Sequence, residues 1–289
     1  MKTVDTYEEE HLKDLRRIAD FCLMDDEFMS LVFENNPAAA QLVLRIILGD
    51  PGLVVAHAHT QETIKNLFGK DVVLDVFCTD SDGNSFNVEI QRNDQGAAPK
   101  RARYHASLVD GKLLAPGSTY KDLPEAYVIF VTENDYFRLA EPLYHIDRTV
   151  AETGLPFGDS QHIIYVNGQY TSDNDLGWLM HDFRCTSSRD MHYDVLRESV
   201  SYYKDHKEGT TAMCRSLEEM RNEYEEKGLQ KGREQGRKQG LEQGEAIGTI
   251  NNMKSTATSL IKNGISPEEI IRMCNYPADL VYEVASSLA

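Results

Sequence analysis

The sequence predicts an α/β protein with one mixed central sheet flanked by helices, followed by a helical C-terminal tail. Two observations predict the sheet. Residues 72–78 and 85–91 are short runs rich in Val, Ile and Phe around an Asp82-Gly83 turn, which is typical of a β-hairpin. Residues 126–131 and 162–166 are almost continuously apolar, as central buried strands are. Helical segments before, between and after these strands complete the element order of an α/β core.

Composition limits the class of protein. The chain has 289 residues and is 41% hydrophobic, enough for one large domain or one domain with appendages. It has no apolar run of about 18 residues and an acidic start, so we expect neither a transmembrane helix nor a signal peptide. Its five scattered cysteines lack CxxC or metal-ligand spacing, which predicts free thiols in a reducing compartment. We therefore expect a cytoplasmic protein with no membrane partner.

The charge is unevenly distributed along the chain. A net charge of −17 argues against a general nucleic-acid binder, because such proteins usually need a basic footprint. Residues 92–112 nevertheless carry five bases against two acids, and residues 227–238 carry five bases against one acid. Both stretches are candidates for local basic patches on an acidic protein.

Apolar residues at helical spacing predict the helices. In residues 6–24 they recur at intervals of three or four. Residues 37–48 form a second helix, because Pro37 suits a first turn and a glycine-containing turn follows. Further helices are expected over residues 99–114, 173–184 and 190–206, and a short strand over residues 53–56.

Side-chain alternation in the hairpin brings two carboxylates to one polar patch. With a three-residue loop that ends at Gly83, the register places Asp75 opposite Glu89, and Asn87 and Gln91 share the face of Glu89. Like charges directly opposite each other destabilise a sheet, and a divalent cation between them reverses the sign of the interaction. Carboxylate oxygens suit Mg²⁺ or Mn²⁺, which can activate water against a phosphodiester. A carboxylate pair on a solvated strand face is the alternative.

The C-terminal part of the chain is predicted to be helical throughout. Residues 215–262 are helix-forming, with a glycine at every fourth position from Gly228 to Gly248. This segment is either a polar, partly frayed linker or a close-packed oligomerisation helix in which glycines let backbones approach. A capping box at Ser266 opens a small helical pair that we expect to serve packing or assembly.

The ordered motifs together resemble a known family. In chain order they are Leu74-Asp75-Val76, Asp82-Gly83, Asn87-Val88-Glu89-Ile90-Gln91, Arg101-Ala102-Arg103-Tyr104, the turn from Gly117 to Pro124, Tyr127-Val128-Ile129-Phe130-Val131 and the run from His162 to Gly168. The set resembles the PD-(D/E)XK nuclease superfamily, and more closely the Rpn-type recombination-promoting nucleases, also called PD-(D/E)XK putative transposases. The resemblance covers nearly the whole chain. It implies a restriction-endonuclease-like core over residues 1–210, followed by the glycine-repeat segment 211–262 and the helical pair 263–289.

The resemblance also implies an activity and its residues. The activity is a metal-dependent DNA nuclease in DNA recombination, mobile-element activity or defence against foreign DNA. Asp75 and Glu89 stand at the acidic motif positions and would bind Mg²⁺ or Mn²⁺. Gln91 stands where the superfamily usually has lysine; glutamine also occurs in this family, and it orients water or phosphate only through hydrogen bonds. Gln61 and Glu62 are the candidates for the upstream, often acidic position.

Two arginines are candidates for substrate binding. Arg101 and Arg103 lie at a predicted helix start, where a backbone phosphate is favoured, and a solvated helix start is the alternative. We expect DNA as the partner and a homo-oligomer formed through the tail. The alternative is a catalytically weak or inactive oligomeric DNA-binding or interaction protein that keeps the nuclease fold, as Gln91 in place of lysine suggests. A third interpretation makes the tail a regulator of the nuclease.

The histidines give no further catalytic signal in the sequence. His57 and His59 alternate along a predicted strand without a third ligand, so we expect both to face solvent. His181 next to Asp182, and His192 ten residues on, have no partner spacing that favours catalysis.

Overall fold

Six strands form one mixed sheet in the order β1-β2-β3-β4-β6-β5. The computed structural model describes residues 4–66 and 69–288. The strands are β1 Val55–Ile64, β2 Val72–Asp80, β3 Ser85–Gln91, β4 Ala126–Thr132, β5 Leu143–Ile146 and β6 Gln161–Asn167. Strands β1, β2 and β3 pair antiparallel, β3, β4 and β6 pair parallel, and β5 pairs antiparallel with β6. The prediction of a mixed central sheet is confirmed.

The two apolar runs occupy the centre of the sheet as predicted. β4 lies between β3 and β6, and Val128, Ile129, Phe130 and Val131 are all fully buried. Parallel neighbours need a crossover connection, and α4, Pro99–Leu113, provides it between β3 and β4. The start of α4 is therefore held close to the end of β3.

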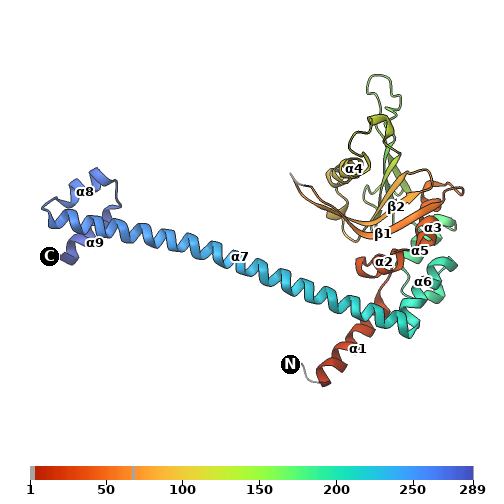
Figure 1. Ribbon diagram of the computed structural model, residues 1–289, viewed down its shortest axis with the longest axis horizontal. Coiled ribbons are helices and arrows are strands. Elements are labelled where there is room, and N and C mark those ends of the chain that lie inside the picture. The colour runs from red at the N-terminus through yellow and green to blue at the C-terminus, as the bar shows by residue number, and fades with distance from the viewer. Residues whose placement is uncertain (1–3, 67–68, 289) are drawn as a thin grey trace. The chain divides into compact units, whose positions relative to one another are not determined.

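Helices cover both faces of the sheet. On one face Ala102 and Ala106 of α4 pack against Val128 and Phe130. The other face is covered by four helices that share one apolar core, namely α2 Asp26–Phe33, α3 Pro37–Leu48, α5 Asp175–Arg184 and α6 Asp194–Asp205. Figure 1 shows α4 on the opposite side of the sheet from α2, α3, α5 and α6.

Three elements differ from the sequence-based expectation. The predicted helix over residues 6–24 is α1, Val4–Asp20, and is followed by the separate helix α2, which the sequence did not predict. The predicted strand over residues 53–56 is the longer β1, whose outward positions are polar. Strand β5 was also not expected. These segments are short or polar, and their contacts with the sheet decide their conformation more than their own periodicity does. Three 3₁₀ turns complete this part of the chain, η1 Asp94–Ala97, η2 Tyr120–Asp122 and η3 Ser188–Asp190.

The chain divides into two units, one ending at Glu218 and the other beginning at Glu219. The C-terminal unit holds the end of α7, Lys207–Lys262, with α8 Pro267–Cys274 and α9 Ala278–Leu288. Its core consists of five buried residues, Ala257, Ile270, Leu280, Val281 and Val284. Both hydrogen bonds of the capping box between Ser266 and Glu269 are present, as predicted. The division into the three parts expected from the sequence, residues 1–210, 211–262 and 263–289, stays a prediction.

The glycine repeat lies within α7. A Cβ added to any glycine from Gly228 to Gly248 would have no heavy atom within 4 Å beyond the local helix backbone, among the described residues. The repeat is therefore exposed within this chain. In the described part of the chain, no helix has the length and apolar character that crossing a bilayer requires.

Candidate active site

The β2–β3 hairpin has the register that the sequence predicts. The paired residues run from Thr79 opposite Ser85 to Val76 opposite Val88, so the next pair is Asp75 and Glu89. Gly83 has φ +89°, a conformation that favours glycine, and its N–H donates to the Asp80 carbonyl across the turn at 3.4 Å. The turn thus fixes which side chains of the two strands meet.

Glu89 is a fully buried carboxylate surrounded by side-chain donors. Arg101 Nη2 donates to its Oε2 at 2.9 Å, and Asn87 Nδ2 donates to its Oε1 at 3.1 Å. His105 Nδ1 lies 3.3 Å from the same Oε1. Because Arg101 Nε donates to His105 Nε2 at 3.2 Å, the ring proton of His105 belongs on Nδ1, facing Glu89. The start of α4 therefore supplies the groups that stabilise this buried charge.

Asp75 lies beside Glu89 and has an unusual acidity. The Ile90 N–H donates to Asp75 Oδ2 at 2.9 Å, and the Asp75 N–H lies 3.4 Å from Glu89 Oε1. Burial, followed by the negative charge of Glu89, raises the pKa of Asp75 to about 8. Asp26 adds to this increase, while Arg101 and the Ile90 hydrogen bond oppose it. The protein therefore holds carboxylates together at an electrostatic cost.

Gln91 completes the polar side of β3. Its Nε2 lies 3.4 Å from Asp75 Oδ2, and its Oε1 lies 3.5 Å from Arg101 Nη1. A Cβ placed on Gly96 would fall 1.7 Å from Gln91 Oε1, so the Gln91 side chain occupies the space that a larger residue at 96 would need. Gly96 thus allows Gln91 to lie between Asp75 and Arg101.

A third carboxylate comes from α2. Burial raises the pKa of Asp26, and the charges of Glu27 and Glu89 raise it further. The neighbouring Asp25 does not share this role, because it pairs with Arg92 at 3.1 Å. The sequence did not identify Asp26, although three consecutive acids, Asp25, Asp26 and Glu27, ahead of an apolar run are a helix-start signal that could have found it.

The two upstream candidates have different positions. Gln61 lies within β1 with a left-handed backbone, φ +53°, and its Nε2 donates to Asp26 Oδ1 at 2.9 Å. Continuing the register of β1 with β2 places Gln61 beside Asp75. Glu62 instead forms an ion pair with Lys112 near the end of α4. The structure therefore brings Gln61 to the carboxylates through Asp26, and it turns Glu62 toward Lys112.

The two arginines at the start of α4 also differ. Arg101 and His105 are four residues apart and lie on the helix face that meets Glu89. Arg103 is exposed, and within the described residues its side chain has no hydrogen bond or ion pair. His57 and His59 on β1 are exposed, in agreement with the expectation from the sequence.

Comparison with known proteins agrees with this geometry. Residues 52–171, which run from just before β1 through β6, match the model of the family described as PD-(D/E)XK nuclease family transposase. This central segment is therefore similar to the PD-(D/E)XK nuclease family transposases. The match contains Asp75, Glu89, Gln91 and Arg101, whereas Asp26 precedes it. Neither the curated proteins nor the solved structures gave a match to the chain.

The donor set fits the divalent metals that PD-(D/E)XK nucleases generally use. Asp26, Asp75 and Glu89 offer carboxylate oxygens, and Gln61 and Gln91 offer amide oxygens, which are the ligands that Mg²⁺ and Mn²⁺ prefer. The raised pKa of Asp75 shows that the protein itself does not fully compensate these charges. A divalent cation bound between these carboxylates would do so.

Proposed function

We propose that the protein is a Mg²⁺- or Mn²⁺-dependent DNA nuclease that hydrolyses phosphodiester bonds. The observation that supports this most strongly is the position of Asp75 beside Glu89, next to Gln91 and Arg101, inside an α/β fold whose central segment matches a nuclease-family model. Nucleases of this family act on DNA, so DNA is the substrate that we propose.

Each residue has a proposed task. Asp75 and Glu89 hold the metal ion, and Asp26 assists them. Such an ion, when bound, supplies an activated water and neutralises charge on the phosphodiester. Gln91 orients the attacking water or the phosphate through its amide, because its two neighbours, Asp75 and Arg101, fix the direction of that amide.

Arg101 is the proposed phosphate contact. Its three nitrogens contact Glu89, His105 and Gln91, and its side chain is 37% exposed, so the remaining N–H groups of its two terminal nitrogens are the ones that would meet a DNA phosphate. Arg103 is two residues further along α4, and its side chain is exposed and would be open to the DNA. This pair therefore replaces the positive charge that a lysine at position 91 would provide, with Arg101 the closer of the two to the carboxylates.

The wider role that we propose rests on the resemblance to this family. We place the protein among the Rpn-type nucleases, in DNA recombination, mobile-element activity or defence against foreign DNA, and in the cytoplasm. We also propose that α7 joins copies of the chain into a homo-oligomer, because its glycine repeat is exposed and would let a second helix approach closely.

The test is cleavage of plasmid DNA by the purified full-length chain. We expect the plasmid to be degraded with Mg²⁺ and left intact with EDTA. The cleavage rate of Asp75→Ala should be lower than that of the wild type by at least about 100-fold, because a group that stabilises developing charge is removed. Asp82→Ala is the matched control, since Asp82 lies exposed in the same hairpin turn. Cleavage by Asp75→Ala at the wild-type rate would overturn the proposal.

One observation supports the non-enzymatic alternative. Both oxygens of Glu89 already face donors from Arg101, Asn87 and His105, and so the carboxylate is compensated in part without a metal. A catalytically inactive protein that keeps the fold would bind DNA in a gel-shift experiment and leave it uncut with every divalent ion. That result would favour the interaction protein over the nuclease.

A further inference from the structure

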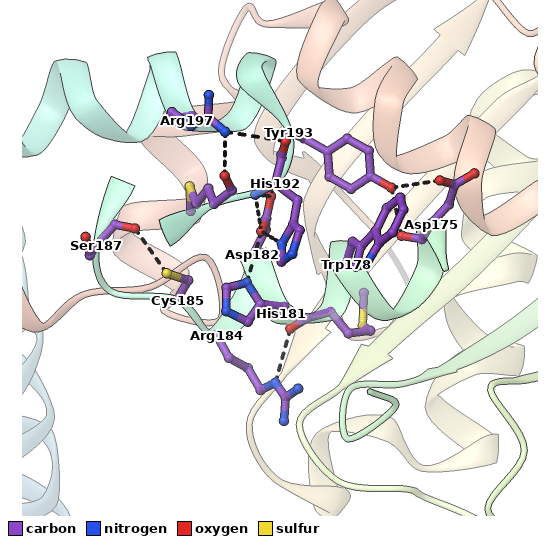
Figure 2. Close-up of polar contacts among 12 residues, drawn as sticks. Asp175, Trp178, His181, Asp182, Arg184, Cys185, Ser187, His192, Tyr193 and Arg197 are labelled. Atoms are coloured by element: carbon purple, nitrogen blue, oxygen red, sulfur yellow. Dashed lines mark hydrogen bonds and ion pairs between the residues drawn. The ribbon is translucent and has the colours of Figure 1, made fainter. Parts of the chain in front are cut away.

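A second cluster of ligand-type side chains lies outside the family-matched segment. His181, Asp182 and His192 place one potential ligand atom each within 4.8 Å of one another (Figure 2). Asp182 and His181 are on α5, and His192 lies between η3 and α6. No residue of the carboxylate site contributes to this cluster.

The separations of these atoms suit a metal ion. His181 Nδ1 lies 3.2 Å and His192 Nδ1 lies 3.1 Å from the same atom, Asp182 Oδ1. Around a tetrahedral ion with bonds of about 2.0–2.1 Å, ligand atoms are about 3.3 Å apart. The two imidazole nitrogens lie within 4.8 Å of each other, so an ion that replaces the two Nδ1–Oδ1 hydrogen bonds would draw these nitrogens together.

The cluster is also fixed in advance. Asp182 is fully buried, and the backbone N–H groups of His192 and Tyr193 donate to its carboxylate at 2.8 and 2.9 Å. The His192 ring stacks on Trp178, with centroids 5.8 Å apart and planes 7° from parallel. Backbone and aromatic contacts thus hold the carboxylate and one imidazole in place without an ion, which lowers the entropic cost of binding one.

The cluster is open on one side. The side chains of His181 and His192 are 46% and 41% exposed, so an ion has access from solvent and a position is left for water or another ligand. Two imidazoles with one carboxylate favour zinc and neighbouring transition metals over Mg²⁺ or Ca²⁺. We propose that His181, Asp182 and His192 form a second metal site, for Zn²⁺ or a related transition-metal ion, that links α5 to the segment before α6.

The experiment measures Zn²⁺ binding to the full-length chain by calorimetry, after EDTA treatment and dialysis and with excess Mg²⁺ present to compete at the carboxylate site. We expect one site in the wild type and at least a tenfold weaker affinity in His192→Phe and in His181→Gln. His192→Phe keeps an aromatic ring against Trp178 while removing the ligand nitrogen. His162→Ala is the matched control, because His162 also faces one carboxylate, that of Asp147, at 2.7 Å.

Two further measurements keep the proposal testable if a variant is less stable. Zn²⁺ should raise the melting temperature of the wild type and of His162→Ala, and should not raise that of His192→Phe. Co²⁺ in place of Zn²⁺ should give visible absorption without a thiolate band. Equal Zn²⁺ affinity in wild type and both histidine variants, or a thiolate band from a cysteine ligand such as Cys185, would overturn the proposal.

Discussion

Two fully buried carboxylates, Glu89 and Asp182, show how differently this protein compensates a buried charge. Glu89 is held by side chains, chiefly Arg101 and His105, and lies among other acids. Asp182 is held by two backbone N–H groups and two half-exposed imidazoles. The surroundings of Glu89 leave carboxylate oxygens in excess. The surroundings of Asp182 place two imidazole nitrogens next to one carboxylate oxygen. The groups that stabilise each carboxylate therefore select the kind of cation that it can accept.

The largest expected effect follows from removing the side-chain cation of the first cluster. Arg101→Met leaves Glu89 buried with fewer donors, so we expect unfolding free energy to fall by about 1–3 kcal/mol and DNA cleavage to fall by about 100-fold. Chemical denaturation and plasmid cleavage measure the two effects. Zn²⁺ binding should be unchanged, because the histidine cluster does not use Arg101.

Arg103→Met is the matched control for Arg101. Its side chain is exposed, so we expect a stability change within about 0.5 kcal/mol and a smaller loss of cleavage. If both arginine variants had the same stability, the buried pair with Glu89 would not be the main compensation of that charge, and the contrast with Asp182 would weaken.

The second prediction concerns pH. The pKa of Asp75 is raised to about 8 in the folded protein and is about 3.9 in the unfolded chain, so the folded state binds the proton more tightly. The stabilisation from this proton is fully present below about pH 4 and is lost as pH rises to about 8. In EDTA, Asp75→Asn should therefore melt at a higher temperature than wild type at pH 8, by a few degrees. The difference should shrink toward pH 5.

The control for this pH effect is Asp82→Asn in the hairpin turn. Its melting temperature should follow that of the wild type across the pH range, because Asp82 is exposed. Mg²⁺ at pH 8 should narrow the gap between wild type and Asp75→Asn. Parallel pH curves for wild type and Asp75→Asn would show that Asp75 titrates normally, and the excess negative charge of this cluster would then be absent.

The smallest expected effect comes from Gly96→Ala. The new methyl group would displace Gln91 from its place between Asp75 and Arg101, and we expect cleavage to fall by roughly three- to tenfold. Gly111→Ala, in a helix with no neighbour within 4 Å, should stabilise the protein by about 0.5–1 kcal/mol and leave cleavage unchanged. Wild-type cleavage by Gly96→Ala would show that the position of Gln91 does not set the rate.

Much of the carboxylate site was predictable because it depends on local rules. Alternation along two adjacent strands and the glycine of their turn set the register that brings Asp75 beside Glu89. The helix that follows β3 after a short connection brings Arg101 to the same place. These residues are close in sequence, and few conformations connect them.

Asp26 and Gln61 could not be assigned in the same way. Asp26 is 49 residues before Asp75; its three consecutive acids can mark a helix start, but nothing local in the sequence places that helix beside the hairpin. Gln61 faces Asp26 because one residue in β1 adopts a left-handed backbone, which no local signal marks for glutamine. The choice between Arg101 and Arg103 likewise depended on which face of α4 meets the sheet.

The sequence by itself determined the hairpin register, the two buried central strands and the capped C-terminal helical pair, because alternation, continuous apolarity and capping act over a few residues. The tertiary structure decided which acid joins Asp75 and Glu89, and it brought His192 to His181 and Asp182. Each of these two clusters joins residues from separate helices, strands or connecting segments. They depend on how α2, α5 and the segment before α6 pack onto one core, which no single stretch of sequence specifies.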